Sequence, residues 1–548
     1  KFEHAIPFAM EPVVYDFSIN ENGTTGEIHT GKNALMPEEY YTLLLPKLLK
    51  KELQELSLCQ RNELAVLSRS YKSGKLYSGF INNLFDRMIP QGQEEDTKKK
   101  PLDALLAELG FNPEQHELIR GDLKSGRISL SKNRLPANTT VEDPRPGELA
   151  DQSALNDEKL IETGKQALRN GEVAIVTLAG GVGSRWTKGA GVVKSLNPFA
   201  KLSGRHRNFI EIHLAKTRKA NAEYSTKLQH VFTSSYLTHE PIESFLQEYQ
   251  NNHNGFSIYL SHGKVTGLRL TPTERDLRFL WEEMPQQQLD EQSQKVMQSL
   301  HAALINWAKS TGEAEDYRDN LPSQCIHPVG HWYEVPNLFL NGTLLKLIQE
   351  NPGLRHLMVH NIDTLGADLN PALLGYHIRQ QSGMTAEVIT RRLDDRGGGL
   401  AKVNGQLRLV EGLALPDEKT EFNLSYYSTN TFWINIDKLL GVFGLTRNDL
   451  SDRQKVETQV FRMASRIPTY VIIKDVKKRW GKAQEDVFPV TQFEKLWGDM
   501  TAIPELNCSY VNVSRMRGQQ LKEISQLDGW SRDGSKEYVE NLCLWGEG

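Results

Sequence analysis

The sequence is poor in cysteine, lacks long apolar runs and carries almost no net charge, and each of these absences excludes a class of protein. The four cysteines among 548 residues lie far apart, at Cys59, Cys325, Cys508 and Cys543, and form no C-x-x-C pair. Thiols this sparse make neither a disulfide framework nor a cysteine-rich metal site. We therefore expect reduced thiols, as in proteins of the cytoplasm.

Membrane and nucleic-acid partners are not expected either. No apolar run approaches the roughly 20 residues that cross a bilayer, and the first residues lack a basic stretch followed by an apolar one. The 65 Lys and Arg residues nearly balance the 69 Asp and Glu residues, which gives a net charge of −4. This balance disfavours general binding to nucleic acid and leaves room for a local basic site that holds phosphate. A cytoplasmic location fits these features best.

The length and the residue pattern indicate a folded protein of two or three domains. Apolar residues recur at every third or fourth position over residues 36–88 and 101–123, which predicts helices, and the charged run 91–100 between them predicts a solvated loop. We predict three parts: a mainly helical N-terminal domain (1–165), a catalytic core (166–500) and a short C-terminal region (501–548).

The core is predicted to alternate strands with helices. Residues 173–178 are a short apolar run that follows the turn signal Asn170-Gly171, as expected for a buried parallel strand. Helical patterns at 155–170, 210–222, 241–251 and 342–351 separate similar runs. Those runs are residues 229–233, 256–260, 356–359, 386–390 and 470–473. This order predicts an α/β fold with a mostly parallel central sheet covered on both faces.

Glycines follow the first of these strands in the segment LAGGVGSRWTKGAGVVKS, residues 178–195. Gly180, Gly181 and Gly183 can adopt positive φ and let backbone N–H groups approach an anion such as a nucleotide phosphate. A dinucleotide-binding fingerprint is excluded because Trp186 stands where it needs Gly or Ala, and no G-x-x-x-x-G-K-[ST] string occurs. The competing interpretation is a tight strand-to-helix turn without a ligand.

This segment resembles the signature of the UTP-dependent sugar-1-phosphate uridylyltransferases, in particular eukaryotic-type UDP-glucose pyrophosphorylase and UDP-sugar pyrophosphorylase. The signature is Gly-Gly-x-Gly-[ST] followed by Pro-Lys-Ser, and here Val193 replaces the proline before Lys194. Further segments resemble the family in the correct order: 232–234, 328–331, 361–367, 396–400, 408–411, 428–433, 467–474 and 490–494. The resemblance implies a Rossmann-like nucleotidyltransferase core.

It also implies a reaction between two anions. The phosphate of a sugar 1-phosphate attacks the α-phosphorus of UTP in line and expels pyrophosphate, so catalysis consists of positioning and charge stabilisation. Lys194 and Lys474 are implied to meet at the phosphates. Arg185, directly after the glycines, either assists the leaving pyrophosphate or forms a surface ion pair.

Asp363 follows an apolar run at a strand end, where open parallel sheets bind ligands. A single carboxylate there suits Mg²⁺, which fills its other positions with water and phosphate, and the resemblance points the same way. For the nucleotide, the resemblance and the glycine turn together implicate Ala179, Gly180, Gly181, Gly183, Ser234, His262, Gly330 and His331. For the sugar, they implicate Asn361, Gly397, Gly398, Glu411 and Asn430. A plain hairpin turn is the alternative for the paired glycines.

Three departures keep alternatives open. His262 stands where the family reads uracil with Gln, Trp332 follows His331 in place of glycine, and Gly399 replaces a threonine of the glucose-type enzymes. The first expectation is formation of UDP-glucose. The alternatives are a UDP-N-acetylhexosamine or broad-specificity UDP-sugar pyrophosphorylase, for which Gly399 leaves room, and a regulator that binds a nucleotide sugar without catalysis.

Overall fold

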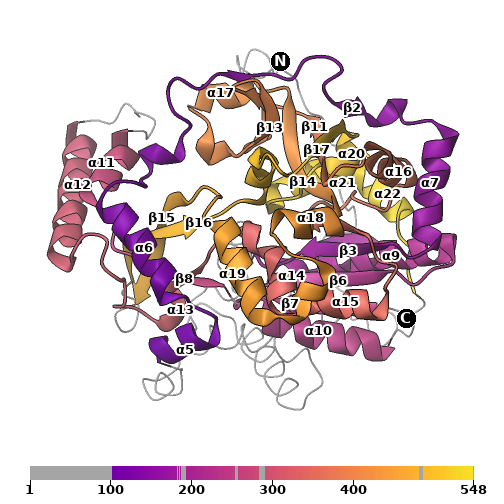
Figure 1. Ribbon diagram of the computed structural model, residues 1–548. Coiled ribbons are helices and arrows are strands. Elements are labelled where there is room, and N and C mark those ends of the chain that lie inside the picture. Colours follow the sequence, from indigo (N-terminus) through magenta and orange to yellow (C-terminus); the bar gives the residue numbers. More distant parts are fainter. Residues whose placement is uncertain are drawn as a thin grey trace, which may run out of the picture.

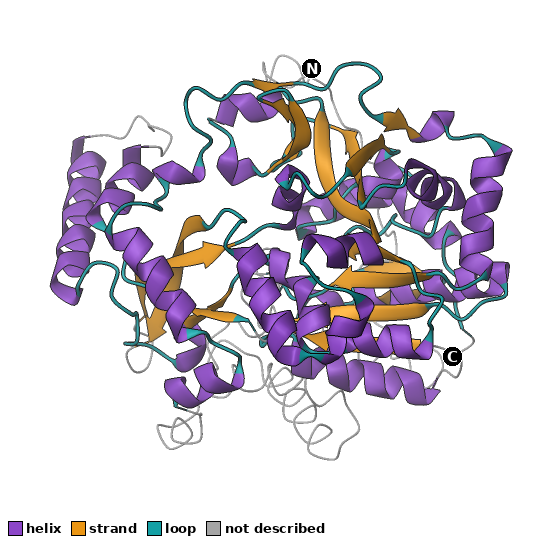
Figure 2. Ribbon diagram, viewed as in Figure 1, coloured by secondary structure: helices purple, strands orange, loops and turns teal. Residues whose placement is uncertain are grey.

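The computed structural model describes residues 101–181, 183, 186, 193–252, 257–263, 265–282, 291–416, 418–479 and 485–546. The helices predicted over residues 36–88, the charged loop 91–100 and Arg185 lie outside these ranges. The molecule combines helices and strands throughout the described part (Figure 2).

A large central sheet organises the fold (Figure 1). Its strand order is β2 (Ala150–Asp151), β17 (Cys508–Asn512), β11 (Met384–Thr390), β14 (Tyr426–Asn435), β10 (His356–Asn361), β3 (Val173–Leu178), β6 (Gln229–Ser234) and β7 (Ser257–His262). Only β14 runs antiparallel to its neighbours β11 and β10 along this path, and the other adjacent pairs are parallel. The predicted α/β class with a mostly parallel sheet is confirmed.

The register of this sheet places the site. Asn361 at the end of β10 pairs with Leu178 at the end of β3, and Leu178 pairs with Thr233 near the end of β6. The carboxyl ends of these three strands therefore meet along one edge, where open parallel sheets bind ligands.

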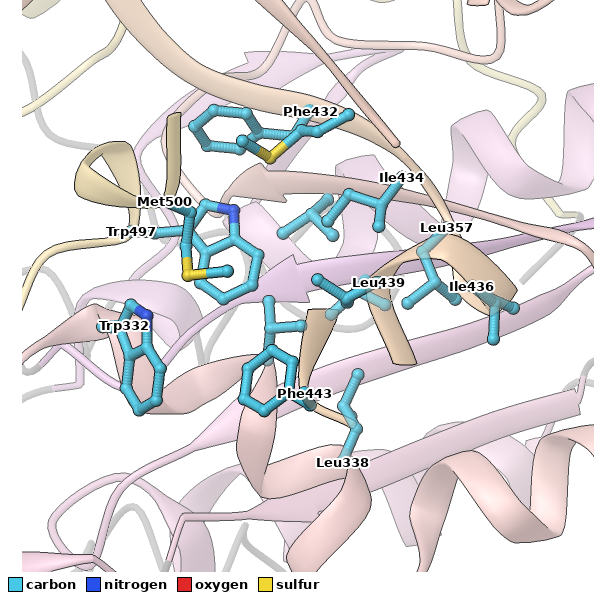
Figure 3. Close-up of a cluster of buried hydrophobic side chains, with 14 of the residues drawn as sticks. Trp332, Leu338, Leu357, Phe432, Ile434, Ile436, Leu439, Phe443, Trp497 and Met500 are labelled. Carbon is cyan, nitrogen blue, oxygen red and sulfur yellow. The ribbon is translucent and has the colours of Figure 1, made fainter. Parts of the chain in front are cut away.

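Helices cover both faces because alternate side chains of the strands point in opposite directions. Ala174 and Val176 of β3 belong to the apolar cluster of Figure 3, which also contains Trp332, Phe432 and Trp497. The helices of this layer are α14 (Pro336–Leu340), α15 (Thr343–Glu350), α18 (Ile436–Val442) and α19 (Arg453–Ala464). Val173 and Ile175 pack instead with α7 (Glu158–Arg169) and α16 (Pro371–Gln380).

Helix α9 (Phe209–Tyr224) starts at a capping box, in which the Asn208 side chain accepts from the Glu211 N–H and Glu211 accepts from the Asn208 N–H. It packs with α10 (His239–Asn252) in a further apolar cluster. The predicted helices at 155–170, 210–222, 241–251 and 342–351 are thereby confirmed as α7, α9, α10 and α15.

A second group of elements lies at one side of the molecule, around the β15–β16 hairpin (Figure 1). β15 (Tyr470–Arg479) and β16 (Glu485–Glu494) form a two-stranded sheet, so the predicted strand at 470–473 exists but lies outside the central sheet. The helices of this group are α5 (Leu102–Glu108), α6 (Pro113–Lys124), α11 (Glu274–Glu282), α12 (Glu291–Thr311) and α13 (Pro322–Cys325). The remaining strands pair as β1 (Val141–Glu142) with β12 (Gly399–Val403), β12 with β13 (Gln406–Val410), β4 (Ala200–Leu202) with β5 (Arg205–Arg207), and β8 (Thr266–Leu268) with β9 (Ile326–Pro328).

The C-terminal part packs against the core through α20 (Arg515–Gly518), α21 (Leu527–Arg532) and α22 (Ser535–Asn541). A fully buried ion pair joins Arg517 of α20 to Glu387 of β11, with a second contact from Arg517 to Asp368. Strands from both predicted flanking regions, β2 and β17, therefore lie in the same sheet as the core strands. Within the described ranges, we find no helix whose length and apolar content would let it cross a bilayer.

Candidate active site

The glycine-rich turn is held in place at the end of β3. The Ala179 N–H donates to Thr233 Oγ1 at 3.2 Å, and the Ser235 hydroxyl donates to the Gly180 carbonyl at 2.6 Å. Gly181 is exposed, and a Cβ there would meet nothing within 4 Å. The turn thus presents an accessible backbone at the edge where the strand ends meet.

Gly183 is required where Lys194 approaches the turn. Its φ of +74° is in the left-handed region, and a Cβ on it would overlap the Lys194 side chain. The Lys194 ammonium lies 5.2 Å from the ring centre of Phe209 and 5.6 Å from that of Trp186, which stabilise the buried cation through cation–π contact.

Lys194 is ion-paired with Asp363, so the structure brings two predicted site residues together. The ammonium donates to Asp363 Oδ2 at 2.8 Å and to the Leu521 carbonyl at 2.9 Å. Burial alone would raise the pKa of the Asp363 carboxyl, but Lys194 and, more weakly, Lys522 outweigh burial and hold that pKa below its ordinary value. Asp363 is therefore a carboxylate at neutral pH.

Asp363 also has an oxygen to spare. Its Oδ1 is buried and accepts no hydrogen bond from another described residue. An unpaired carboxylate oxygen at a strand end suits a hard cation such as Mg²⁺. The described residues contain no group of three or more His, Cys, Asp or Glu side chains that could hold a metal ion, so a metal here would depend on Asp363, with water and phosphate as the remaining ligands.

Lys522 is a site residue that sequence reasoning missed. Its ammonium contacts the Tyr427 hydroxyl and lies 5.2 Å from the centre of that ring. It also lies close enough to Asp363, Glu411 and His331 to lower the pKa of each group. Lys522 stands in a polar segment with no preceding apolar strand, so only an alignment with family members reaching that far along the chain could have found it.

Lys474 occupies a different place. Its side chain is exposed on β15, opposite Val490 of β16, and its charge lowers the pKa of Glu494, which burial raises. Among the described residues no contact joins Lys474 to the Lys194–Asp363 pair. A phosphate role for Lys474 stays a prediction.

Glu334, a second missed residue, lies against the glycine-rich turn. It accepts a hydrogen bond from the Thr233 hydroxyl and another from the Gly180 N–H. Burial raises its pKa to about 7, although both hydrogen bonds favour the charged form. Near neutral pH this carboxyl is poised between its two protonation states beside the expected phosphate site.

The other predicted nucleotide residues line the ends of β6, β7 and β9. The Ser234 hydroxyl is 2.9 Å from His239 Nδ1, and the His239 ring stacks on His262 with ring centres 3.8 Å apart. Gly330, with φ +95°, lies where a Cβ would overlap the Lys495 backbone.

His331 follows Gly330, and its Nδ1 accepts from the Trp497 N–H at 3.4 Å. Burial, and then Lys522, lower its pKa to about 4. The neighbouring Trp332 is fully buried in the apolar cluster of Figure 3, so this departure from the family pattern fills the core.

The predicted sugar residues form two pairs. Asn430 Nδ2 donates to Asn361 Oδ1 at 2.7 Å across β14 and β10, and a bulge in β14 with φ +53° at Asn430 aims that amide. A Cβ on Gly398 would lie 2.5 Å from the Val410 carbonyl and 3.3 Å from Glu411 Oε2, so glycine permits this close approach. The backbone around Gly397 is fixed because its N–H donates to Glu421 at 2.5 Å.

Asp499, also missed from sequence, lies beside Glu411. Burial and then the Asp499 charge raise the pKa of Glu411, and burial raises the pKa of Asp499. Tyr470 Oη is 3.1 Å from Asp499 Oδ1. Two neighbouring buried carboxyl groups of this kind share a proton near neutral pH.

The prediction that Gly399 leaves extra room is wrong. A Cβ at this position would overlap the Tyr426 carbonyl and lie 2.6 Å from Arg391 Nη2. Arg391 also donates to the Gly397 and Gly398 carbonyls at 3.2 Å, so its guanidinium fills this space and supports the turn.

Comparisons with known proteins agree with this geometry. A family model described as UTP--glucose-1-phosphate uridylyltransferase matches residues 128–262 and 307–526, a range that includes Lys194, Asp363 and Lys522. The enzyme of that name from Musa acuminata is 22% identical over 349 residues, which cover 61% of this chain and 64% of the relative. The one from Encephalitozoon cuniculi is 32% identical over 123 residues, 21% of this chain and 24% of the relative. The matches thus span less than two thirds of these relatives.

Solved structures share the fold. UDP-glucose phosphorylase from Trypanosoma brucei superposes with a TM-score of 0.51 at 18% identity, covering 78% of each chain. A mutant of UDP-glucose pyrophosphorylase from Leishmania major, in complex with UDP-glc, gives a TM-score of 0.51 at 16% identity over 82% of this chain and 77% of that one. Because the family model matches well over half of the residues, the chain belongs to the UTP--glucose-1-phosphate uridylyltransferase family.

Proposed function

We propose that the protein is a uridylyltransferase that forms a UDP-sugar and pyrophosphate from UTP and a sugar 1-phosphate, with glucose 1-phosphate as the first substrate to test. The observation that carries the proposal is the Lys194–Asp363 pair, joined by Lys522, beside an exposed glycine-rich backbone at the meeting point of β3 and β10.

The reaction needs cations more than nucleophiles. Both substrates are anionic, and the enzyme must hold them together in line while charge spreads over the transferred phosphoryl group. Lys194 and Lys522 would neutralise this charge from two directions, and the backbone N–H groups of the glycine-rich turn would hold the remaining phosphate oxygens. The sugar phosphate itself is the nucleophile, so no side chain has to form a covalent bond.

Asp363 would anchor the expected Mg²⁺ through Oδ1, the oxygen that Lys194 does not occupy. When bound, the metal neutralises phosphate charge. Asn361, Asn430 and Glu411 would orient the sugar, since amide and carboxyl groups can both donate to and accept from hydroxyls.

Pyrophosphate release tests the proposal. The purified protein is given UTP and Mg²⁺ with glucose, galactose, N-acetylglucosamine or xylose 1-phosphate in separate reactions. Release with at least one sugar phosphate, abolished by a metal chelator, is the expected result. The filled space at Gly399 leads us to expect no gain for N-acetylglucosamine 1-phosphate over glucose 1-phosphate.

The contrary result is also informative. Folded protein that releases no pyrophosphate from any of these sugars, with UTP or with ATP, CTP or GTP in its place, refutes the transferase. Calorimetry with UDP-glucose on the same sample then distinguishes a nucleotide-sugar binder from a protein with no such ligand.

A further inference from the structure

Buried side chains hold the loop that carries Asp363. We call residues 361–367 the Asp363 loop, and four of its carbonyl oxygens accept hydrogen bonds from buried Lys and His side chains. His213 Nε2 is 2.8 Å from the Ile362 carbonyl, and His360 Nδ1 is 2.9 Å from that of Asn361. Lys216 donates to the Leu365 carbonyl at 2.7 Å and also to the Ala367 carbonyl.

The acceptors fix which atoms carry protons. A carbonyl oxygen can only accept, so His213 donates from Nε2 and His360 donates from Nδ1. Burial lowers the pKa of both rings, which are therefore neutral, and Nε2 of His360 is left as an acceptor. That nitrogen lies 3.0 Å from the Thr177 hydroxyl, which can donate to it.

The same chain of hydrogen bonds continues back to α9. Thr177 Oγ1 is 2.9 Å from His230 Nε2, and His230 Nδ1 is 2.8 Å from the Thr217 hydroxyl. Every group donates once and accepts once if the bonds run from Thr217 through His230, Thr177 and His360 to the loop. The network is thus complete with neutral side chains and one set of tautomers.

Lys216 is the strongest link in this support. It is 7% exposed, and burial lowers its pKa to about 7. A neutral amine still has two N–H bonds, which is the number that the two carbonyls require. Lys216 therefore holds residues 365 and 367 in either protonation state. It also borders a cavity of about 220 Å³, with Tyr224, Met358 and Asp368 in its wall.

A buried amine is expensive to keep where Met or Leu would pack as well, so its contacts need a reason. We propose that Lys216, supported by His213 and His360, is a positioning residue that fixes the Asp363 loop and so sets where Asp363 meets Lys194. Its role in the reaction rests on the proposed function, whereas its hold on the loop does not.

The test compares Lys216→Met, which removes the donors, with Lys216→Arg, which keeps them and can extend into the adjoining cavity. Lys219→Met is the matched control, because Lys219 lies on the same helix and borders the same cavity but donates to the Asn541 carbonyl. Hydrogen–deuterium exchange of peptides covering 361–368 reports the loop directly, and steady-state kinetics report kcat, KM and the Mg²⁺ concentration at half-maximal rate.

We expect Lys216→Met to speed exchange in this segment about tenfold without a chain-wide increase. We also expect it to lower kcat about 10- to 100-fold, to raise the half-maximal Mg²⁺ concentration and to leave the KM for the sugar phosphate nearly unchanged, as misplacement of a catalytic group predicts. Lys216→Arg should recover most of both losses, and Lys219→Met should behave as wild type. Thr177→Val, which interrupts the chain to His360 with little change of volume, should show a smaller change in the same direction and replaces Lys216→Met if that variant does not fold.

Wild-type exchange and wild-type kcat in Lys216→Met overturn the proposal. Faster exchange across the whole chain in both Lys216 variants also overturns it, because that pattern indicates a structural role only. An inactive wild-type protein whose loop still loosens in Lys216→Met refutes the proposed function and leaves the support of the loop established.

Discussion

At the scale of single residues, two lysines compete for the role of second phosphate cation. Lys522 lies within electrostatic reach of Asp363 and Glu411, whereas Lys474 is exposed on β15. We expect Lys522→Ala and Lys194→Ala each to lower kcat by about 100- to 1,000-fold, as loss of a preorganised charge at a phosphoryl centre does. We expect Lys474→Ala to lower it less than about threefold, since exposed charges contribute little.

Pyrophosphate release under saturating UTP measures all three variants, and circular dichroism confirms that they are folded. A Lys474→Ala protein that loses as much activity as Lys194→Ala would restore the assignment made from sequence and show that the hairpin moves onto the substrates.

Glu334 makes a prediction about pH. Its pKa is about 7 in the folded protein and 4.5 in an ordinary environment, so between these values the folded state holds a proton that the unfolded state has lost. Stability contributed by this group is therefore complete below pH 4.5 and falls as the pH rises to about 7. Glu334→Gln mimics the protonated form and removes this dependence.

Urea unfolding at several pH values measures the effect. We expect the variant to gain about 2 to 3 kcal/mol on wild type between pH 4.5 and 7.5. Glu457→Gln, at an exposed pair with Arg453, should show no such trend. A difference between Glu334→Gln and wild type that stays constant with pH would falsify the protonation assignment.

The site residues found from sequence share a local signal that the missed ones lack. Lys194 follows a glycine-rich turn and Asp363 ends an apolar run, so each could be placed at a strand end. Glu334, Asp499 and Lys522 stand in segments without such markers. Their neighbours are set by chain crossings hundreds of residues long, which local patterns do not encode.

At the scale of elements, the uninterrupted apolar strands were predicted to within two residues at most ends because a strand buried on both faces has no polar positions. β14 was not predicted as a strand. It carries Ser428, Thr429, Asn430 and Thr431 in its middle, and these polar residues are accommodated by the bulge and by bonds such as that from Thr429 Oγ1 to the Glu387 carbonyl at 2.8 Å.

Helices α7 and α16 cross at two glycines. A Cβ on Gly164 would overlap the Pro371 carbonyl, and a Cβ on Gly375 would overlap that of Leu160. We expect Gly164→Ala to lower the free energy of unfolding by about 1 to 3 kcal/mol, because the helices must move apart. Urea denaturation provides the measurement.

Gly121 of α6 is the control for that variant. A Cβ there meets nothing within 4 Å, so Gly121→Ala should stabilise the protein by about 0.5 to 1 kcal/mol through helix propensity alone. Equal stability of Gly164→Ala and wild type would show that the crossing can relax.

At the scale of the whole molecule, Arg517 connects the C-terminal part to the central sheet. Its Nε and Nη2 each donate to Glu387 at 2.8 Å, and neither side chain is exposed. We expect Arg517→Met to cost about 3 to 5 kcal/mol in the free energy of unfolding, because it leaves Glu387 buried without its partner.

Adding Glu387→Gln to Arg517→Met should recover part of this loss, since the unpaired charge is then removed. Arg466→Met, which breaks an exposed pair with Glu505, should cost less than about 1 kcal/mol. Chemical unfolding of the four proteins decides the matter, and an Arg517→Met variant as stable as the Arg466→Met control contradicts the prediction.

The contact between Lys194 and the Leu521 carbonyl joins residues 327 positions apart. A ribosome that has released β3, β6 and β7 has therefore made the glycine-rich turn but not the segment that brings Lys522 to it. Nascent chains that stop before residue 522 lack the second cation, so every interrupted translation product should be silent in turnover while still displaying the turn. Activity in the cell then counts only chains whose synthesis has passed this residue.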